Sequence, residues 1–277
     1  MRKRPLGAFG AISLMGLVLI AIFANQIAPY SPVEQLTRQY YLLPPGSEGP
    51  TARFWFGTDR YARDLFSRVV YGSRISLYVG IGSVILASTF GTAIGVFSGY
   101  AGGKIDLFLQ RFVDVWLGFP SLIFTILIVS MLGQSLNNVV IAIALSSWAR
   151  FSRLARSQAL SVRGLDYVTA AQAMGASNMR QLIYHVLPNS LTPVIILSTS
   201  LLGTAIVAEA SLSFLGLGVP PPWPAWGRLL QESQRTQLEA APWLSIFPGL
   251  ALTFAVYGFN MFGDALRDQL DPRLRGA

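Results

Sequence analysis

Long stretches without a charged residue divide this chain. Three such runs, Pro5–Val33, Ile75–Gly103 and Val115–Ala149, each exceed the roughly 20 apolar residues that a helix needs to cross a bilayer. Backbone groups in lipid must satisfy one another, so runs of this length are predicted to be transmembrane helices. Charged residues make up 12% of the 277 residues, against about 25% in soluble domains. The sequence therefore predicts an all-α integral membrane protein.

Six transmembrane helices account for these runs and for two apolar stretches nearer the C-terminus. The turn-forming residues 133–138 split the third uncharged run into two spans. The first run is too long for the apolar region of a signal peptide, about 7–15 residues, which favours a retained helix over a cleaved leader. The expected spans are Leu6–Ala28, Ile75–Phe97, Leu107–Leu132, Val139–Phe151, Ser190–Gly216 and Trp243–Gly263.

The fourth of these spans is short, because charge appears at Arg150 and Arg153. Either these side chains extend toward the membrane surface or neighbouring helices shield them.

Three parts of the chain follow from the spans. Residues 1–28 form a cytoplasmic stub and the first helix, residues 29–74 an outer loop, and residues 75–277 a five-helix core with a cytoplasmic loop at 150–187. The net charge is +8, and arginines in the short loops place both termini in the cytoplasm by the positive-inside rule. The basic residues punctuate apolar runs and build no nucleic-acid-binding module, so we expect membrane lipid and no nucleic acid as a partner.

The cytoplasmic loop has the pattern of a helical hairpin. Asp166 is placed to cap a helix that ends near Met174, Gly175 to adopt a left-handed conformation, and Ser177 to cap a second helix reaching about Val186. Small residues leave one face of the first helix flat. The residues alone allow either an ordinary connection between spans or a docking surface.

The same loop resembles the cytoplasmic signature of ABC importer permeases. That signature reads Glu-Ala-Ala, three residues, Gly, and then Ile-x-Leu-Pro ten residues later. Here Thr169 stands in place of Glu and His185 in place of Ile, with Gly175 and Pro188 retained. In the family this loop is a coupling helix that seats on an ATPase subunit. The resemblance implies ATPase-coupling roles for Thr169, Ala170, Ala171, Met174, Gly175, Ala176, Ser177 and Asn178.

Three further segments are similar to C-type permeases of dipeptide, oligopeptide and nickel importers. They are residues 56–77, with Ala62 where Gly is expected, 209–227 and 260–272. The resemblance covers residues 57–273. It implies the type I importer permease fold, half of a translocation pathway in the cell inner membrane, and transport of peptides or similar small solutes. Implied partners are a second, B-type permease, two ATPase subunits and an extracytoplasmic solute-binding protein.

Chemistry of its own is not expected of this chain. Lys104 follows two glycines, but Ser98 and Ile105 break the phosphate-loop pattern. We therefore expect no enzyme activity and no cofactor bound here, with ATP and Mg on the partner subunits. The chain has no cysteine and one histidine, so no metal site is expected. The rival classes are a secondary transporter or channel, which would need broken helices with ionisable groups at mid-membrane, and a membrane-embedded enzyme.

Two features inside the spans have more than one interpretation. Glu209 is the single ionisable residue of the fifth span, near its outer end, and is either a structural or vestibule residue of the pathway or a proton relay. Gly91, Gly95 and Gly99 continue a ridge of small residues that suits close helix packing, within the chain or against the partner permease.

Overall fold

The computed structural model describes residues 5–36, 49–234 and 241–270. The basic residues 2–4 and the tail from residue 271, both expected in the cytoplasm, lie outside the described residues. The described part is helical, with a single isolated bridge between Thr58 and Asp64. Its elements are α1 (Pro5–Ile22), α2 (Ala24–Ile27), α3 (Leu65–Ala101), α4 (Gly103–Leu117), α5 (Ser121–Leu132), α6 (Leu136–Arg163), α7 (Asp166–Ala173), α8 (Asn178–Gln181), the π-helical turn η2 (Leu182–Val186), α9 (Leu187–Phe214), α10 (Trp226–Gln234) and α11 (Trp243–Leu270).

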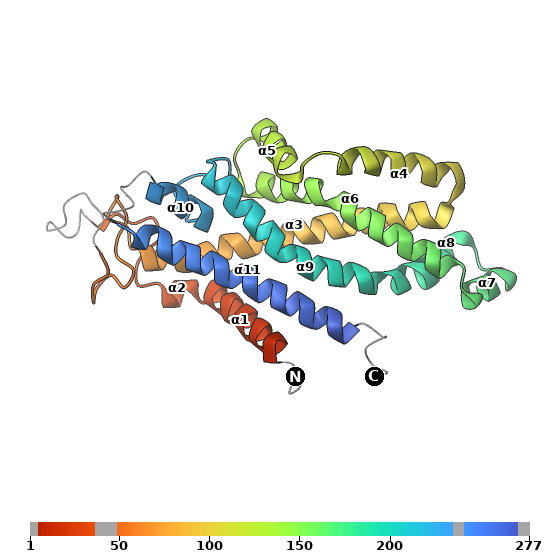
Figure 1. Ribbon diagram of the computed structural model, residues 1–277, viewed down its shortest axis with the longest axis horizontal. Coiled ribbons are helices and arrows are strands. Elements are labelled where there is room, and N and C mark those ends of the chain that lie inside the picture. The colour runs from red at the N-terminus through yellow and green to blue at the C-terminus, as the bar shows by residue number, and fades with distance from the viewer. Residues whose placement is uncertain (1–4, 37–48, 235–240, 271–277) are drawn as a thin grey trace.

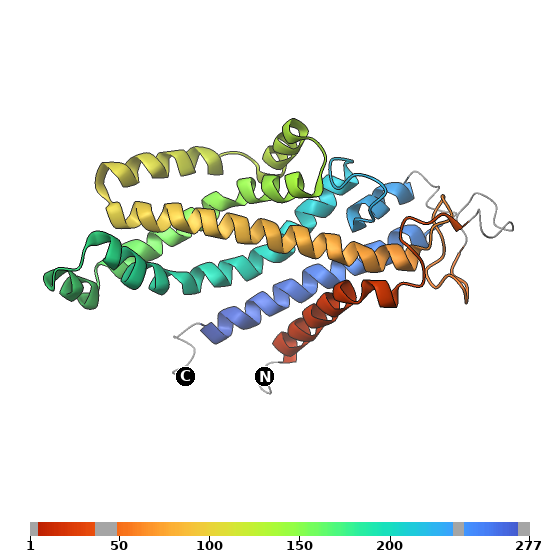
Figure 2. The same ribbon diagram turned by 180° about the vertical axis from the view of Figure 1, so that it is seen from behind.

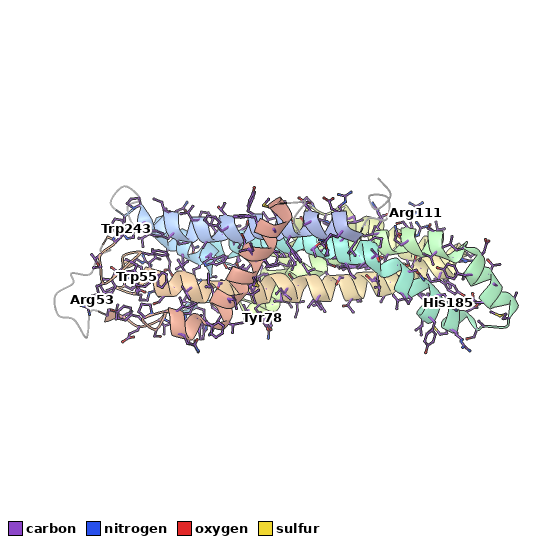
Figure 3. The ribbon with its side chains drawn as sticks, turned by 90° about the horizontal axis from the view of Figure 1, so that it is seen from below. Arg53, Trp55, Tyr78, Arg111, His185 and Trp243 are labelled. Carbon is purple, nitrogen blue, oxygen red and sulfur yellow. The ribbon has the colours of Figure 1, made fainter. Side chains whose placement is uncertain are left out.

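The long helices α3, α6, α9 and α11 run lengthwise through an elongated bundle (Figures 1 and 2). α7 and α8 lie at one end, which we call the hairpin end. α10 and the segment 49–64 lie at the opposite end, which we call the α10 end. Figure 3 shows the same polarity, with His185 near the hairpin end and Trp55 and Trp243 near the other. α1 packs antiparallel against α11, where Gly10 lies against Met261.

The expected all-α membrane fold is confirmed, although several helix bounds differ from the expectation. α3, α9 with the preceding α8 and η2, and α11 are each long and apolar enough to cross a membrane, and the bent pair α4–α5 forms a fourth candidate. α1 is a shorter apolar helix. α6 occupies the place of the expected fourth span and carries arginines along its second half.

The second span starts earlier than expected. α3 begins at Leu65, not Ile75, because the Asp64 side chain caps it by accepting a hydrogen bond from the Ser67 amide at 2.8 Å. Arg68 and Arg74 therefore lie within a helix and not in the expected loop.

The third and fourth spans also differ. The expected single span Leu107–Leu132 is two helices that meet at 90° beside Pro120, whose ring prevents a continuous helix. The expected fourth span ended at Phe151, but α6 continues to Arg163. No separate helix ends at Val186, since α8, η2 and α9 form one helical stretch.

Candidate functional site

The α7–α8 hairpin, residues 166–181, extends past the ends of the long helices (Figure 1). α7 begins at Asp166 after an N-cap at Leu165, so Asp166 is the first helical residue and not the cap that the sequence predicts. Gly175 has φ 86°, the left-handed conformation expected of it. The Ser177 hydroxyl accepts a hydrogen bond from the Arg180 amide at 3.4 Å and caps α8, as expected. These features fix a sharp turn between the two helices.

Most of the residues with an expected coupling role are on the outer surface of the hairpin. The Met174 side chain is 83% exposed. Ala171 differs, because it is 5% exposed. Its side chain presents little surface to a partner, and its expected coupling role stays a prediction. The exposed members of the set are Thr169, Ala170, Met174, Gly175, Ser177 and Asn178, and Ala176 is partly buried.

Hydrogen bonds join the base of the hairpin to the end of α3. The Tyr100 hydroxyl lies 3.1 Å from the Gln181 side-chain oxygen and 3.3 Å from that of Asn178. The Gln181 side-chain NH2 group donates a hydrogen bond to the Ala176 carbonyl at 2.8 Å, and the Arg163 guanidinium donates one to the Tyr100 carbonyl at 2.8 Å. Any force on the hairpin would therefore act on α3 and α6 as well as on α9.

The glycine ridge of α3 lies against α6 within this chain. A Cβ atom added at Gly91, Gly95 or Gly99 would collide with the carbonyl oxygen of Trp148, Ser152 or Arg156, respectively. The collisions advance by four residues on both helices, so two straight backbones approach along their length. This contact makes α3 and α6 the most extensively packed pair in the bundle.

Three arginines on one face of α6 are spaced three residues apart, at positions 150, 153 and 156. Arg156 forms a paired contact with Asp106 of α4, with both nitrogen–oxygen distances 2.6 Å. Arg153 forms an ion pair with Asp114, also on α4. Arg150 instead lines a cavity of about 200 Å³ between α3, α5, α6 and α9.

Glu209 lies on α9, toward the α10 end, and its side chain is fully buried. One carboxylate oxygen accepts a hydrogen bond from the Ser213 hydroxyl at 2.6 Å. Its other oxygen has no hydrogen-bond partner among the described residues. Glu209 does not line the cavity that Arg150 lines, so the two ionisable groups belong to different environments.

Comparison with known proteins decides the family. Residues 91–276 match the model of the binding-protein-dependent transport system inner membrane component. Residues 1–45 match the N-terminal transmembrane domain of oligopeptide transport permease C. The chain belongs to the first of these families, the permease subunits of ABC importers.

The similar proteins match this permease over nearly its whole length. The dipeptide transport system permease protein DppC of Alkalihalophilus pseudofirmus is 44% identical over 99% of this chain and 88% of its own length. The glutathione transport system permease protein GsiD of Escherichia coli is 38% identical over 99% of this chain and 89% of its own. A chain of the MetNI methionine ABC transporter, solved in inward-facing conformations, matches with a TM-score of 0.54 and 16% identity, covering 70% of this chain and 94% of its own. That last likeness concerns the fold.

A buried ion cluster at the α10 end of the permease was not predicted from the sequence. The Arg63 guanidinium lies 2.6 Å from the Asp59 carboxylate and 3.0 Å from that of Glu232 on α10. Arg68, fully buried on α3, lies 3.3 Å and 3.1 Å from the same two carboxylates. The cluster joins segment 49–64 to α3 and α10. The i, i+4 spacing of Asp59 and Arg63 was a visible signal, but Glu232 is too distant in sequence to be assigned.

Ala62 and Asp64 adjoin Arg63 of the cluster in the sequence, and each has an unusual local environment. Ala62, where the resemblance expects glycine, has φ 55°, in the left-handed region that favours glycine. Burial raises the pKa of the Asp64 carboxyl above its ordinary value, and hydrogen bonds from Ser67 oppose this change. At the position where the resemblance expects glycine, this permease thus has a backbone conformation that glycine adopts readily.

Proposed function

We propose that the permease forms half of the translocation pathway of an importer for peptides or similar small solutes, powered by separate ATPase subunits. The α7–α8 hairpin is its coupling element. The observation that carries the proposal is the exposed, sharply turned hairpin at one end of the bundle, in a chain without a phosphate-loop motif. The dipeptide and glutathione permeases among its relatives support a peptide as solute.

The orientation follows from this assignment. The hairpin end faces the cytoplasm, and the α10 end, with segment 49–64 and the ion cluster, faces the extracytoplasmic side. Under this orientation Arg153, Arg156, Arg163 and Arg180 lie toward the cytoplasmic side of the bundle, in accord with the positive-inside rule. A solute-binding protein delivers its cargo at the α10 end, and a second, B-type permease completes the pathway.

Energy enters at the hairpin. Two ATPase subunits carry ATP and Mg, and their closure moves the hairpins of both permeases. Because the hairpin is hydrogen-bonded to α3 and continuous with α9, its movement tilts both helices. The cavity between the permeases then opens toward the outside, which is alternating access.

Reconstituted vesicles test this function. The permease, its B-type partner and the ATPases should import a labelled peptide when the receptor and ATP are supplied together, and neither alone should suffice. Glu209→Gln should lower assembly or uptake without making uptake dependent on a proton gradient. Uptake that persisted without ATP, or that a protonophore abolished at constant ATP, would favour a secondary transporter.

A further inference from the structure

The cavity between α3, α5, α6 and α9 is lined mainly by hydroxyl groups and apolar side chains, with one charged residue, Arg150. Its lining includes the exposed side chains of Leu122 and Val207, so it opens onto the surface of the permease. Its volume of about 200 Å³ is below the roughly 300–1,000 Å³ of complete ligand pockets. A site shared between two permease subunits would show such a half-pocket in each.

Arg150 differs from the two arginines that follow it on α6. Arg153 and Arg156 are neutralised by aspartates of α4, whereas the Arg150 guanidinium has no hydrogen bond or ion pair with any residue that the structure describes. No carboxylate lines the cavity within the described residues. The positive charge is therefore available to an anion that enters.

The position of Arg150 along α6 makes this charge significant. At 1.5 Å per residue, Arg150 lies about 21 Å along α6 from its first residue, Leu136. This distance is shorter than the roughly 30 Å thickness of the hydrocarbon core, so α6 reaches Arg150 before it could have crossed the core completely. Ionisable residues at such depth are costly unless they face water, a partner charge or a transported solute.

The hydroxyl groups complement Arg150 chemically. Ser83, Ser146, Ser147 and Ser211 each donate a hydrogen bond to a carbonyl of their own helix, at distances of 2.6 to 2.9 Å. Their protons are engaged, so the oxygens remain as acceptors toward the cavity. The cavity lining thus offers one cation together with acceptors for N–H groups.

We propose that Arg150 binds the C-terminal carboxylate of a peptide in transit, while the serine oxygens accept hydrogen bonds from its amide or ammonium groups. This inference rests on the proposed function, because it assigns a residue to the pathway of that importer. Arg150 is then a contact residue for carboxylate-bearing solutes. The alternative occupant is a carboxylate of the partner permease, which would make Arg150 an interface residue.

Thiol protection in the complete transporter tests the proposal without the selectivity of the receptor. The chain lacks cysteine, so Ala208→Cys, on the cavity lining, provides a single reporter in a complex whose other subunits carry no reactive thiol. We expect a dipeptide to slow labelling of this thiol several-fold, and the same dipeptide with a C-terminal amide to protect much less. Arg150→Gln should abolish the difference between the two peptides, and Arg150→Lys should retain part of it.

The exposed Arg111 of α4 provides the matched control, since Arg111→Gln removes a cation outside the cavity and should leave the protection unchanged. A second readout is independent of binding. An anionic thiosulfonate should react faster than a cationic one with the thiol of the Ala208→Cys variant, and Arg150→Gln should lower the ratio of the two rates at least about fivefold.

Equal protection by both peptides in the unaltered complex, or a difference between them that survives Arg150→Gln, would overturn the inference. So would dissociation of the B-type permease on Arg150→Gln with reassembly on Arg150→Lys, because that pattern identifies an interface ion pair. A complex that imports peptide normally in all these variants disproves the role of Arg150 alone. A complex that imports no peptide with ATP and receptor disproves the proposed function.

Discussion

At the residue scale, the close approach of α3 and α6 depends on hydrogen atoms in place of side chains. Gly91, Gly95 and Gly99 allow α3 to lie directly against carbonyl groups of α6. In lipid, helices gain little from apolar burial, so close van der Waals packing of this kind is a main source of association. The ridge should therefore tolerate no added methyl group.

Gly95→Ala tests this contact. The new Cβ would collide with the Ser152 carbonyl oxygen and lie 2.9 Å from the Ala155 Cβ, so we expect a destabilisation of about 1–3 kcal/mol. Gly16→Ala in α1 is the control, because a Cβ there meets nothing within 4 Å. The measurement is the thermal unfolding midpoint in detergent. Equal midpoints for the two variants would show that α3 and α6 separate easily.

The buried ion cluster gives a second prediction at this scale. Glu232→Gln removes one of the two carboxylates facing the fully buried Arg68, so part of that charge loses its compensation. Breaking a buried pair in this way costs about 3–5 kcal/mol. Arg111→Gln is the control, since its pair with Asp114 is 3.8 Å long and exposed, and such pairs contribute about 0–1 kcal/mol.

Proteolysis of segment 49–64 and thermal unfolding should both respond to Glu232→Gln. Unchanged cleavage of this segment would contradict the view that the cluster holds it against α3 and α10.

At the scale of elements, apolar runs located most helices, while their bounds depended on contacts that a single sequence does not display. α6 continues through its arginines because Asp106 and Asp114 of α4 neutralise two of them. Those pairs span 50 and 39 residues of sequence. The turn of the hairpin was predicted, because Gly175 acts through its own backbone conformation and Ser177 through a hydrogen bond to a residue three positions along the chain. The burial of Ala171 was not predicted, because the face of an eight-residue helix that becomes covered depends on its tertiary neighbours.

Gly175 provides the test of the hairpin as an element. Space around its Cβ position is open, so backbone conformation alone limits substitution at φ 86°. Gly175→Val should redirect α8, because a β-branched residue resists this conformation by about 1–3 kcal/mol. Gly175→Asn should be tolerated far better, because asparagine adopts the left-handed region more readily. Association with the ATPases in detergent distinguishes the two, and equal loss in both variants would point to side-chain crowding.

At the scale of the whole molecule, the bundle has two chemically distinct ends. One carries a buried ion cluster and the other an exposed hairpin with arginines beside it. A protein that passes energy from one side of a membrane to the other requires such polarity. The orientation we propose follows from assigning the exposed hairpin as the coupling element.

Single cysteines in the cysteine-free chain report this orientation. Ala52→Cys at the α10 end should react with an impermeant thiol reagent added outside intact cells. Asn178→Cys in the hairpin should react after the membrane is opened. The reverse pattern would invert the topology and remove the basis for the coupling assignment.

In the proposed function the hairpin transmits ATP-driven motion, and a substitution of Met174 is the most direct test of this role. Its side chain is 83% exposed, so Met174→Glu should leave the hairpin folded. Met174→Leu is the matched control, since it keeps an apolar side chain of similar volume. The measurement is receptor-stimulated ATP turnover of the reconstituted transporter, with pull-down of the ATPases from the same preparation. We expect Met174→Glu to reach the membrane but to lose ATPase association or stimulated turnover, while Met174→Leu should retain both. Wild-type association, turnover and import in Met174→Glu would contradict it.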